Sequence, residues 1–210
     1  MSVVSSWFSV VSGAYRGDRS MPDDTAAHPH PAAFSSERIY SECEVNFVRR
    51  SGPGGQHRNK VSTGVVLTHR PTGVKAEAAE RRSQAENRAA ALFRLRVNLA
   101  LQIRCILETG AAAGRAGSGS QPAEIDYRPS ALWRSRCRGG RIELNAEHDD
   151  FPAVLAEALD ALALMDFDHV QAAARLGCSA TQLVKLLKKE PRAMASVNAQ
   201  RQRRDLHPLR

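Results

Sequence analysis

The stretch ECEVNFVRRSGPGGQHRNKVSTGVVLTHRPTGVKAEA, residues 42–78, decides the fold of the first half of the chain. Its opening residues, ECEVNFV, alternate polar and apolar side chains, which is the period-two pattern of a half-buried strand. After a glycine-rich segment, the apolar run GVVLTH (64–69) predicts a second strand. RPTG (70–73) suits a type I turn, with proline second and glycine fourth, and VKAEA (74–78) alternates again as a return strand. The stretch therefore predicts a small antiparallel sheet.

A long helix is predicted to follow the sheet. Ser83 and Glu86 form an S-x-x-E capping box, in which the hydroxyl accepts a helix N–H and the carboxylate reaches back. Apolar residues then recur mostly at three- and four-residue steps, which predicts one stripe covering the sheet: Ala85, Ala89, Leu92, Leu99, Ile103 and Ile106. Four arginines lie mostly off that stripe: Arg88, Arg94, Arg96 and Arg104. The expected fold class is α+β, a small antiparallel sheet packed on one long helix.

The second half of the chain predicts a small helical domain. An amphipathic helix over 154–162 breaks near DFD, and HVQAAARLGCSATQLVKLLKK (169–189) resembles a helix-turn-helix. There Gly177 ends the first helix, and Ser179 with Gln182 forms a second capping box. Pro191 is expected to stop the second helix and leave an unstructured tail. The predicted divisions are a disordered leader (1–35), a sheet-and-helix domain that holds the glycine loop (36–108), a flexible linker (109–130), a helix-turn-helix-like domain (131–192) and a basic tail (193–210).

The composition indicates a soluble protein with a polyanionic partner. The 210 residues carry a formal net charge of +8. The basic excess belongs to residues 36–109 and 151–210, while 110–150 balances. Four cysteines without a CxxC pair suit reduced thiols in the cytoplasm and argue against a zinc site. No apolar run is long enough for a membrane span. An organellar location is the alternative if the serine-rich residues 1–20 are a transit peptide.

The glycine loop SGPGGQ (51–56) fits neither of two common phosphate-binding motifs. A dinucleotide-binding loop that starts at Gly52 and Gly54 needs a third glycine where His57 stands, and a helix directly after it. A Walker-type loop needs Gly-Lys-Ser/Thr after four residues, and the segment has none. No G-x-S-x-G sequence and no clustered His/Cys/Asp set offers a nucleophile. His57 and His69 are interpreted as RNA-contacting or packing residues rather than as bases.

The surroundings of the loop closely resemble the catalytic domain of class I peptide chain release factors. The resemblance covers roughly residues 38–108 and is carried by Gly54-Gly55-Gln56 with Asn59 after it, by LTH and PTG, and by Arg82-Ser83-Gln84 with Asn87. Two positions depart from the family pattern. Arg58 replaces a small apolar residue, and Arg81 stands where the family often has Glu. Neither departure touches the GGQ triplet.

The resemblance implies an enzyme that hydrolyses the ester of peptidyl-tRNA in the ribosomal peptidyl transferase centre. Gly54, Gly55 and Gln56 would be catalytic, with the Gln56 main-chain N–H stabilising the oxyanion. Expected RNA-binding residues are Arg49, Arg50, Arg58, Lys60, Arg82, Lys185, Lys188 and Lys189. No cofactor and no metal are expected. The implied partners are the ribosome, through large-subunit rRNA, peptidyl-tRNA, and a glutamine methyltransferase acting on Gln56. We expect a monomer that does not bind a membrane.

Release factors that read stop codons carry a Pro-x-Thr or Ser-Pro-Phe tripeptide, and this sequence has neither. The chain therefore looks like the short, codon-independent relatives that rescue stalled ribosomes. Two alternatives stay open. One is a release factor for a specialised termination signal, and the other is a regulator that binds DNA or RNA through the helix-turn-helix.

Overall fold

The computed structural model describes residues 30–49, 63–105 and 127–210. These residues divide into two compact units. Within the described ranges, unit 1 comprises residues up to 103 together with 145–156, and unit 2 comprises the remainder. The helix α4 (Phe151–Leu164) begins in unit 1 and ends in unit 2.

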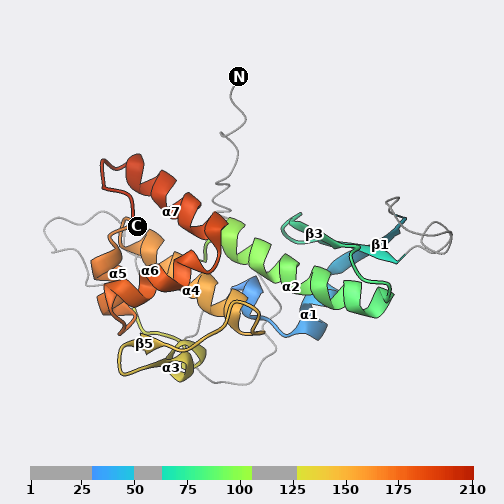
Figure 1. The fold of residues 1–210 in the computed structure, drawn as a ribbon, viewed down its shortest axis with the longest axis horizontal. Coiled ribbons are helices and arrows are strands. Elements are labelled where there is room, and N and C mark those ends of the chain that lie inside the picture. Colours follow the sequence, from blue (N-terminus) through green and yellow to red (C-terminus); the bar gives the residue numbers. More distant parts are fainter. Residues whose placement is uncertain (1–29, 50–62, 106–126) are drawn as a thin grey trace, which may run out of the picture. The chain divides into compact units, whose positions relative to one another are not determined.

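Unit 1 is a three-stranded antiparallel sheet with a long helix packed against it (Figure 1). Its elements are β1 (Cys43–Val48), β2 (Gly64–His69), β3 (Lys75–Ala78) and α2 (Gln84–Gln102), with the short α1 (Ser36–Ser41) ahead of β1. The strand order is β1-β2-β3. Two register pairs, Val65 with Ala78 and Leu67 with Ala76, share one face of the sheet and are buried. The predicted α+β class is confirmed.

The predicted apolar stripe of α2 is wrong in its first half. Ala85 and Ala89 are exposed. The buried positions recur at every fourth residue instead, through Asn87, Ala91, Leu95 and Leu99. Alanine is common on both faces of a helix, so the apolar spacing alone could not choose between the two registers. The helix also ends at Gln102, and Ile103 is its extended cap.

Residues just before α1 belong to the fold of unit 1 rather than to a disordered leader. His30 is buried, and its Nε2 lies 3.3 Å from the carbonyl oxygen of Ile103. The 3-10 helix η1 (Pro31–Ala33) buries Ala32, whose carbonyl accepts a 3.2 Å hydrogen bond from Arg96 Nε. The sequence placed Arg96 off the buried stripe, and this is wrong because the guanidinium is needed there to satisfy a buried carbonyl. Residues 1–29 lie outside the described part of the chain.

The β2–β3 turn begins one residue earlier than predicted. His69 N donates to Val74 O at 2.8 Å, and the carbonyl of His69 accepts from Thr72 N at 3.3 Å and from Gly73 N at 2.7 Å. Gly73 has a φ of 71°, a left-handed conformation that glycine adopts without strain. Pro71 therefore sits third in the turn and Gly73 closes the hairpin.

Unit 2 is mainly helical. Its elements are α3 (Ala131–Arg136), β4 (Cys137–Arg138), β5 (Arg141–Ile142), α5 (His169–Arg175), α6 (Ala180–Lys188) and α7 (Pro191–Gln202). The predicted helix-turn-helix is present as α5 and α6, with Gly177 at a φ of 68° after the first helix. Leu176, Leu183 and Leu186 are buried, as the pattern predicted. The predicted break near DFD is also present, because Asp166 and Phe167 both have positive φ after α4.

The chain after Pro191 is a helix and not an unstructured tail. Pro191 occupies the first turn of α7, where its missing N–H costs no hydrogen bond, and Glu190 caps the helix by accepting from Arg192 N. Val197 is buried in this helix, and Leu209 is buried beyond it. Proline was interpreted as a stop signal although it also favours a helix start.

Both predicted capping boxes are half formed. Ser83 Oγ accepts from Glu86 N at 3.4 Å, and Ser179 Oγ accepts from Gln182 N at 3.2 Å. Among the described residues, Glu86 makes no return bond to Ser83. Gln182 instead turns away from the cap, since its Oε1 accepts from Ile142 N at 3.4 Å.

A buried polar network holds the start of α3 within unit 2. Glu157 accepts hydrogen bonds from Tyr127 Oη at 3.2 Å, from Ser130 N at 2.7 Å and from Ser130 Oγ at 2.5 Å. Burial raises the pKa of both Tyr127 and Glu157. Trp133, almost fully buried, donates from Nε1 to the carbonyl of Leu176 at 2.7 Å. Residues 127–130, predicted as linker, are therefore part of this unit.

None of the helices in the described ranges is both long and apolar enough to span a bilayer.

Candidate functional site

The glycine loop is part of the connection between β1 and β2, and the structure describes only the two ends of that connection. Gly54, Gly55 and Gln56 fall within 50–62, outside the described residues, as do Arg50, Arg58 and Lys60. The ends are Arg49 on one side and Thr63 on the other. Val48 pairs with Gly64 as the last register pair of the two strands. The sheet therefore sets the separation at which the loop begins and ends.

Gly64 allows the two ends of the loop to approach closely. A Cβ placed there would lie 2.8 Å from Val48 Cγ2, 2.8 Å from Val48 O and 3.1 Å from Ala79 Cβ. The first two distances are shorter than non-bonded contacts allow, and one of them is to backbone. Any larger residue would therefore push β1 and β2 apart where they enter the loop.

Asn87 ties the far end of the loop to the start of α2. Its side chain is fully buried. Asn87 Nδ2 donates to Thr63 O at 2.7 Å and to Arg81 O at 2.9 Å, and Oδ1 accepts from Arg81 N at 2.9 Å. One amide thus uses both its donors and an acceptor on backbone groups of two separate segments. Thr63 and Arg81 are held at fixed positions relative to α2.

The sequence named Asn87 as part of the family pattern but gave it no role. The available signal was its position, because a polar residue sits at the start of a stripe that continues through Ala91, Leu95 and Leu99. A polar side chain on a buried stripe must find hydrogen-bond partners, and backbone groups are the usual ones. The incorrect register of the predicted stripe concealed that signal.

Two of the expected RNA-binding cations of unit 1 are described, and both are exposed. Arg49 directly follows β1, and Arg82 lies in the bend that Asn87 holds through Arg81. The two arginines therefore sit on the two segments that Val48 and Asn87 anchor. Arginine binds phosphate with a planar fork of donors, which suits such positions.

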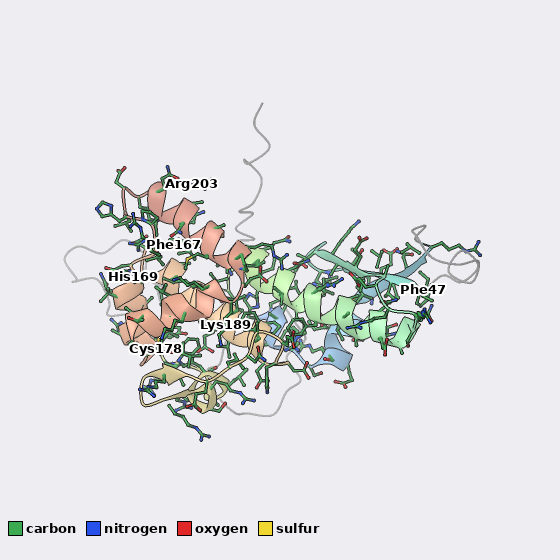
Figure 2. The ribbon with its side chains drawn as sticks, viewed as in Figure 1. Phe47, Phe167, His169, Cys178, Lys189 and Arg203 are labelled. Carbon is green, nitrogen blue, oxygen red and sulfur yellow. The ribbon has the colours of Figure 1, made fainter. Side chains whose placement is uncertain are left out.

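The predicted alternation put Phe47 on the apolar side of its half-buried strand, but Phe47 is an exposed aromatic residue. It pairs with Val65, yet 48% of its surface is exposed, whereas Val65 is fully buried. Figure 2 shows Phe47 at the outer end of the sheet. The alternation of ECEVNFV predicted the strand, but it cannot show that α2 packs against β2 and β3 and leaves this part of β1 uncovered.

His69 is a packing residue. It is fully buried, its Nε2 lies 2.9 Å from Glu42 Oε2, and its Nδ1 lies 2.7 Å from Thr72 Oγ1. Neighbouring Arg70 donates to the carbonyls of Ser41 at 2.6 Å and Glu42 at 3.2 Å. Of the two interpretations offered for His69, the structure favours packing, since both ring nitrogens are used inside unit 1.

In unit 2 the three expected lysines differ in their contacts. Lys185 and Lys188 are exposed on α6. Lys189 Nζ donates to the carbonyl of Leu144 and so links the end of α6 to the chain after β5. These side chains belong to a different unit from the loop.

The buried thiols of the described ranges are poorly suited to act as nucleophiles. No group of three or more His, Cys, Asp or Glu is arranged there to hold a metal ion. Burial raises the pKa of Cys43 to about 11 and of Cys105 and Cys178 to about 12, which disfavours the nucleophilic thiolate. Among the described residues, the candidate site is therefore the pair of loop ends in unit 1.

Comparison with known proteins identifies the same region. Residues 37–121 match the model of the RF-1 domain. Over 106 residues the chain is 40% identical to peptide chain release factor 2 of Paramagnetospirillum magneticum, covering 44% of this chain and 28% of the relative. Over 169 residues it is 30% identical to peptide chain release factor 1 of Leptospira biflexa, covering 74% and 47%. Peptide chain release factor PrfB1, chloroplastic, of Arabidopsis thaliana is 47% identical over 58 residues, covering 28% and 13%.

The sheet, the long helix and the glycine loop thus define an RF-1 domain. Over this domain the chain is similar to class I peptide chain release factors. The chain spans less than half the length of these relatives.

Proposed function

We propose that the chain hydrolyses the ester of peptidyl-tRNA on the ribosome and thereby releases the nascent peptide. The observation that carries this proposal is the GGQ loop within a matched RF-1 domain, with its ends fixed by the Val48–Gly64 pair and by Asn87. A loop that must reach into RNA needs such anchoring because positioning errors of about 1 Å can cost about a hundredfold in rate.

In the proposed reaction a water molecule attacks the ester carbonyl and the C–O bond to the tRNA ribose breaks. The products are the peptide acid and the free tRNA hydroxyl. Gly54 and Gly55 lack a Cβ, so their backbone can approach RNA closely. The main-chain N–H of Gln56 donates to the developing oxyanion, and loss of one such donor costs about 3–4 kcal/mol of barrier. The Gln56 side chain admits water and excludes larger nucleophiles. Arg49 and Arg82 contact phosphates without reading sequence.

We further propose that release serves the rescue of stalled ribosomes. The support is the absence from this sequence of both the Pro-x-Thr and the Ser-Pro-Phe tripeptides that read stop codons in the family. The proposed partners are large-subunit rRNA and peptidyl-tRNA, with a glutamine methyltransferase that modifies Gln56. We propose a monomer that acts without a cofactor.

The test is peptide release from purified ribosome complexes that carry a stop codon, a sense codon or no codon. We expect release from the complex without a codon, and expect Gln56→Ala to abolish it while ribosome binding persists. We expect the Gln56→Ala variant to keep the stability of the parent, because substitutions away from a packed core usually change stability by less than about 0.5 kcal/mol. Full activity of Gln56→Ala would refute the catalytic assignment. Release confined to the stop-codon complex would refute the role in rescue, but it would agree with hydrolysis of the peptidyl-tRNA ester.

A further inference from the structure

The net neutrality of residues 110–150 conceals a strongly basic segment. Residues 127–142 contain five arginines and no aspartate or glutamate. This segment forms α3 and the β4–β5 hairpin of unit 2. The acidic residues that balance it lie before Tyr127 or after Ile142. The charge is therefore concentrated on one small piece of structure.

The hairpin register places arginines on its outer face. Arg138 pairs with Arg141, and Cys137 pairs with Ile142. Paired residues share a face of a two-stranded sheet, and successive pairs alternate. Cys137 and Ile142 face the helices, since Cys137 Sγ lies 3.7 Å from the Gly177 carbonyl and Ile142 is half-buried. Arg138 and Arg141 are exposed on the opposite face.

The Arg138–Arg141 pair places two like charges directly across a hairpin, an arrangement that destabilises a sheet. Glu143 N donates to Arg136 O at 2.9 Å. The nearest acidic residue of the hairpin, Glu143, therefore lies opposite Arg136 and not opposite Arg138 or Arg141. Within the described ranges, Arg134, Arg138 and Arg141 make no ion pair or hydrogen bond through their side chains. An arrangement that costs stability and keeps its charges unneutralised indicates a ligand that neutralises them.

The turn of the hairpin gives this charge close access to a backbone. Gly139 and Gly140 have φ values of 55° and 74°, the pattern of a two-residue type I′ turn. Apart from the glycine itself and its two chain neighbours, no described atom lies within 4 Å of where a Cβ would stand at either glycine. The hairpin therefore ends in an open tip without side chains, flanked on both sides by arginine.

The hairpin is fixed to the helix-turn-helix. Ser179 N donates to Gly140 O at 3.2 Å, and Ile142 N donates to Gln182 Oε1 at 3.4 Å. Lys189 reaches the carbonyl of Leu144 in the segment just after β5. Lys185 lies between Gln182 and Lys189 along the same side of α6 and is exposed. It adds a fourth cation beside the hairpin.

We propose that this basic hairpin surface, defined as Arg134, Arg138, Arg141 and Lys185, binds the phosphate backbone of double-helical RNA. Arginine forks pair with phosphate oxygens, and the glycine tip lets the hairpin approach them. The proposal rests on the proposed function only in taking ribosomal RNA as the source of the duplex. Lys189 is not included because its ammonium group contacts Leu144.

Two observations favour a duplex contacted through its phosphates. Single-stranded RNA is usually held by aromatic side chains that stack on bases, but Tyr127, Trp133 and Phe167, the described aromatic residues of unit 2, are buried. A helix-turn-helix that reads DNA places the N-terminal residues of its second helix in the major groove. Here Ser179 and Gln182 at that end of α6 bond to the hairpin.

The test measures binding of the full chain to duplex RNA of about 20 base pairs, longer than the span of roughly 16 that duplex-binding domains contact. Fluorescence anisotropy titrations would be run over a range of salt concentrations for two unrelated sequences. The variant is Arg138→Gln with Arg141→Gln. We expect equal affinity for both sequences in the parent chain. The variant should flatten the log–log salt dependence by roughly two, since each lost phosphate contact removes about 0.9.

A matched control removes the same charge elsewhere in unit 2. Arg203 and Arg210 are exposed near the C-terminal end, and Figure 2 shows Arg203 far from Cys178 and Lys189, which mark the hairpin side of α6. Arg203→Gln with Arg210→Gln should leave the salt slope unchanged. Circular dichroism would check that both double variants fold as the parent does.

Several outcomes would overturn the proposal. Equal loss in both double variants would mean attraction by net charge alone. Tighter binding to duplex DNA, to single-stranded RNA, or to one of the two sequences would mean a different ligand or direct reading of bases. Because this assay needs no ribosome and no GGQ chemistry, a failed release assay leaves its result intact.

Discussion

Replacing Asn87 with alanine should uncouple the glycine loop from the helix that supports it. The substitution removes three hydrogen bonds, two to backbone carbonyls of Thr63 and Arg81 and one from Arg81 N. Each buried backbone group left without a partner costs about 1–3 kcal/mol. Water entering the vacated space would relieve part of that cost. We expect the free energy of unfolding to fall by about 2–4 kcal/mol.

The more informative effect is on release. Thr63 would no longer be held against α2, so the far end of the loop would sample more positions. Arg49 and Arg82 remain exposed, and their phosphate contacts should persist. In ribosome release assays we therefore expect kcat to fall, by about tenfold or more, with little change in the half-saturating concentration of protein.

Asn98→Ala is the matched control. Asn98 lies on the same helix, and its Nδ2 also donates to a backbone carbonyl, that of Lys75, at 2.8 Å. Lys75 is at the start of β3, away from the strand ends that hold the loop. This variant should lose some stability and keep kcat. If Asn87→Ala kept full kcat at a temperature where it is folded, or if Asn98→Ala lost as much, the positioning argument would fail.

Two further predictions concern stability and can be measured by urea unfolding. Gly64→Ala should lower the free energy of unfolding by about 1–3 kcal/mol, because the added methyl group meets Val48 at 2.8 Å; an unchanged value would show that β1 and β2 separate freely. Arg104→Met should lower the free energy of unfolding by about 3–5 kcal/mol, because it removes the cation that lies 3.6 Å from the almost fully buried Asp160 carboxylate. Adding Asp160→Leu should restore most of that loss. Burial already raises the pKa of Asp160 to about 7, above its unfolded value, so the Arg104→Met loss should grow as pH rises through 7; a loss independent of pH would contradict this.

The strands of unit 1 were predictable because alternation is a local property. The run GVVLTH became β2 with the bounds that its pattern indicated, and VKAEA supplied β3. The start of α2 after Ser83 was equally local, since one side chain and one N–H three residues on decide it. Such signals need no knowledge of what the segment packs against.

The roles of polar residues inside the fold were not predictable in the same way. Arg96 is buried because it donates to the carbonyl of Ala32, and Arg104 is buried because it contacts the carboxylate of Asp160. Both partners lie more than fifty residues away in sequence. Asn87 is buried for the same kind of reason. The hairpin 137–142 has too short a pattern to be predicted from sequence, because its docking on α6 holds it in place.

Cations that are bonded within their own unit change what the net charge of the chain means. Arg70, Arg96 and Arg201 donate to backbone carbonyls, and Arg104 lies against Asp160, so none of the four is available to phosphate without breaking a contact of its own unit. The formal charge of +8 therefore overstates the RNA-facing charge at some surfaces and understates it at others. Residues 110–150 balance to zero, yet they hold the hairpin arginines, which make no such contact within the described ranges. The affinity for RNA should therefore depend on which arginine is replaced and not on how many arginines remain. Only a cation that is not neutralised in the free protein releases counterions from RNA on binding.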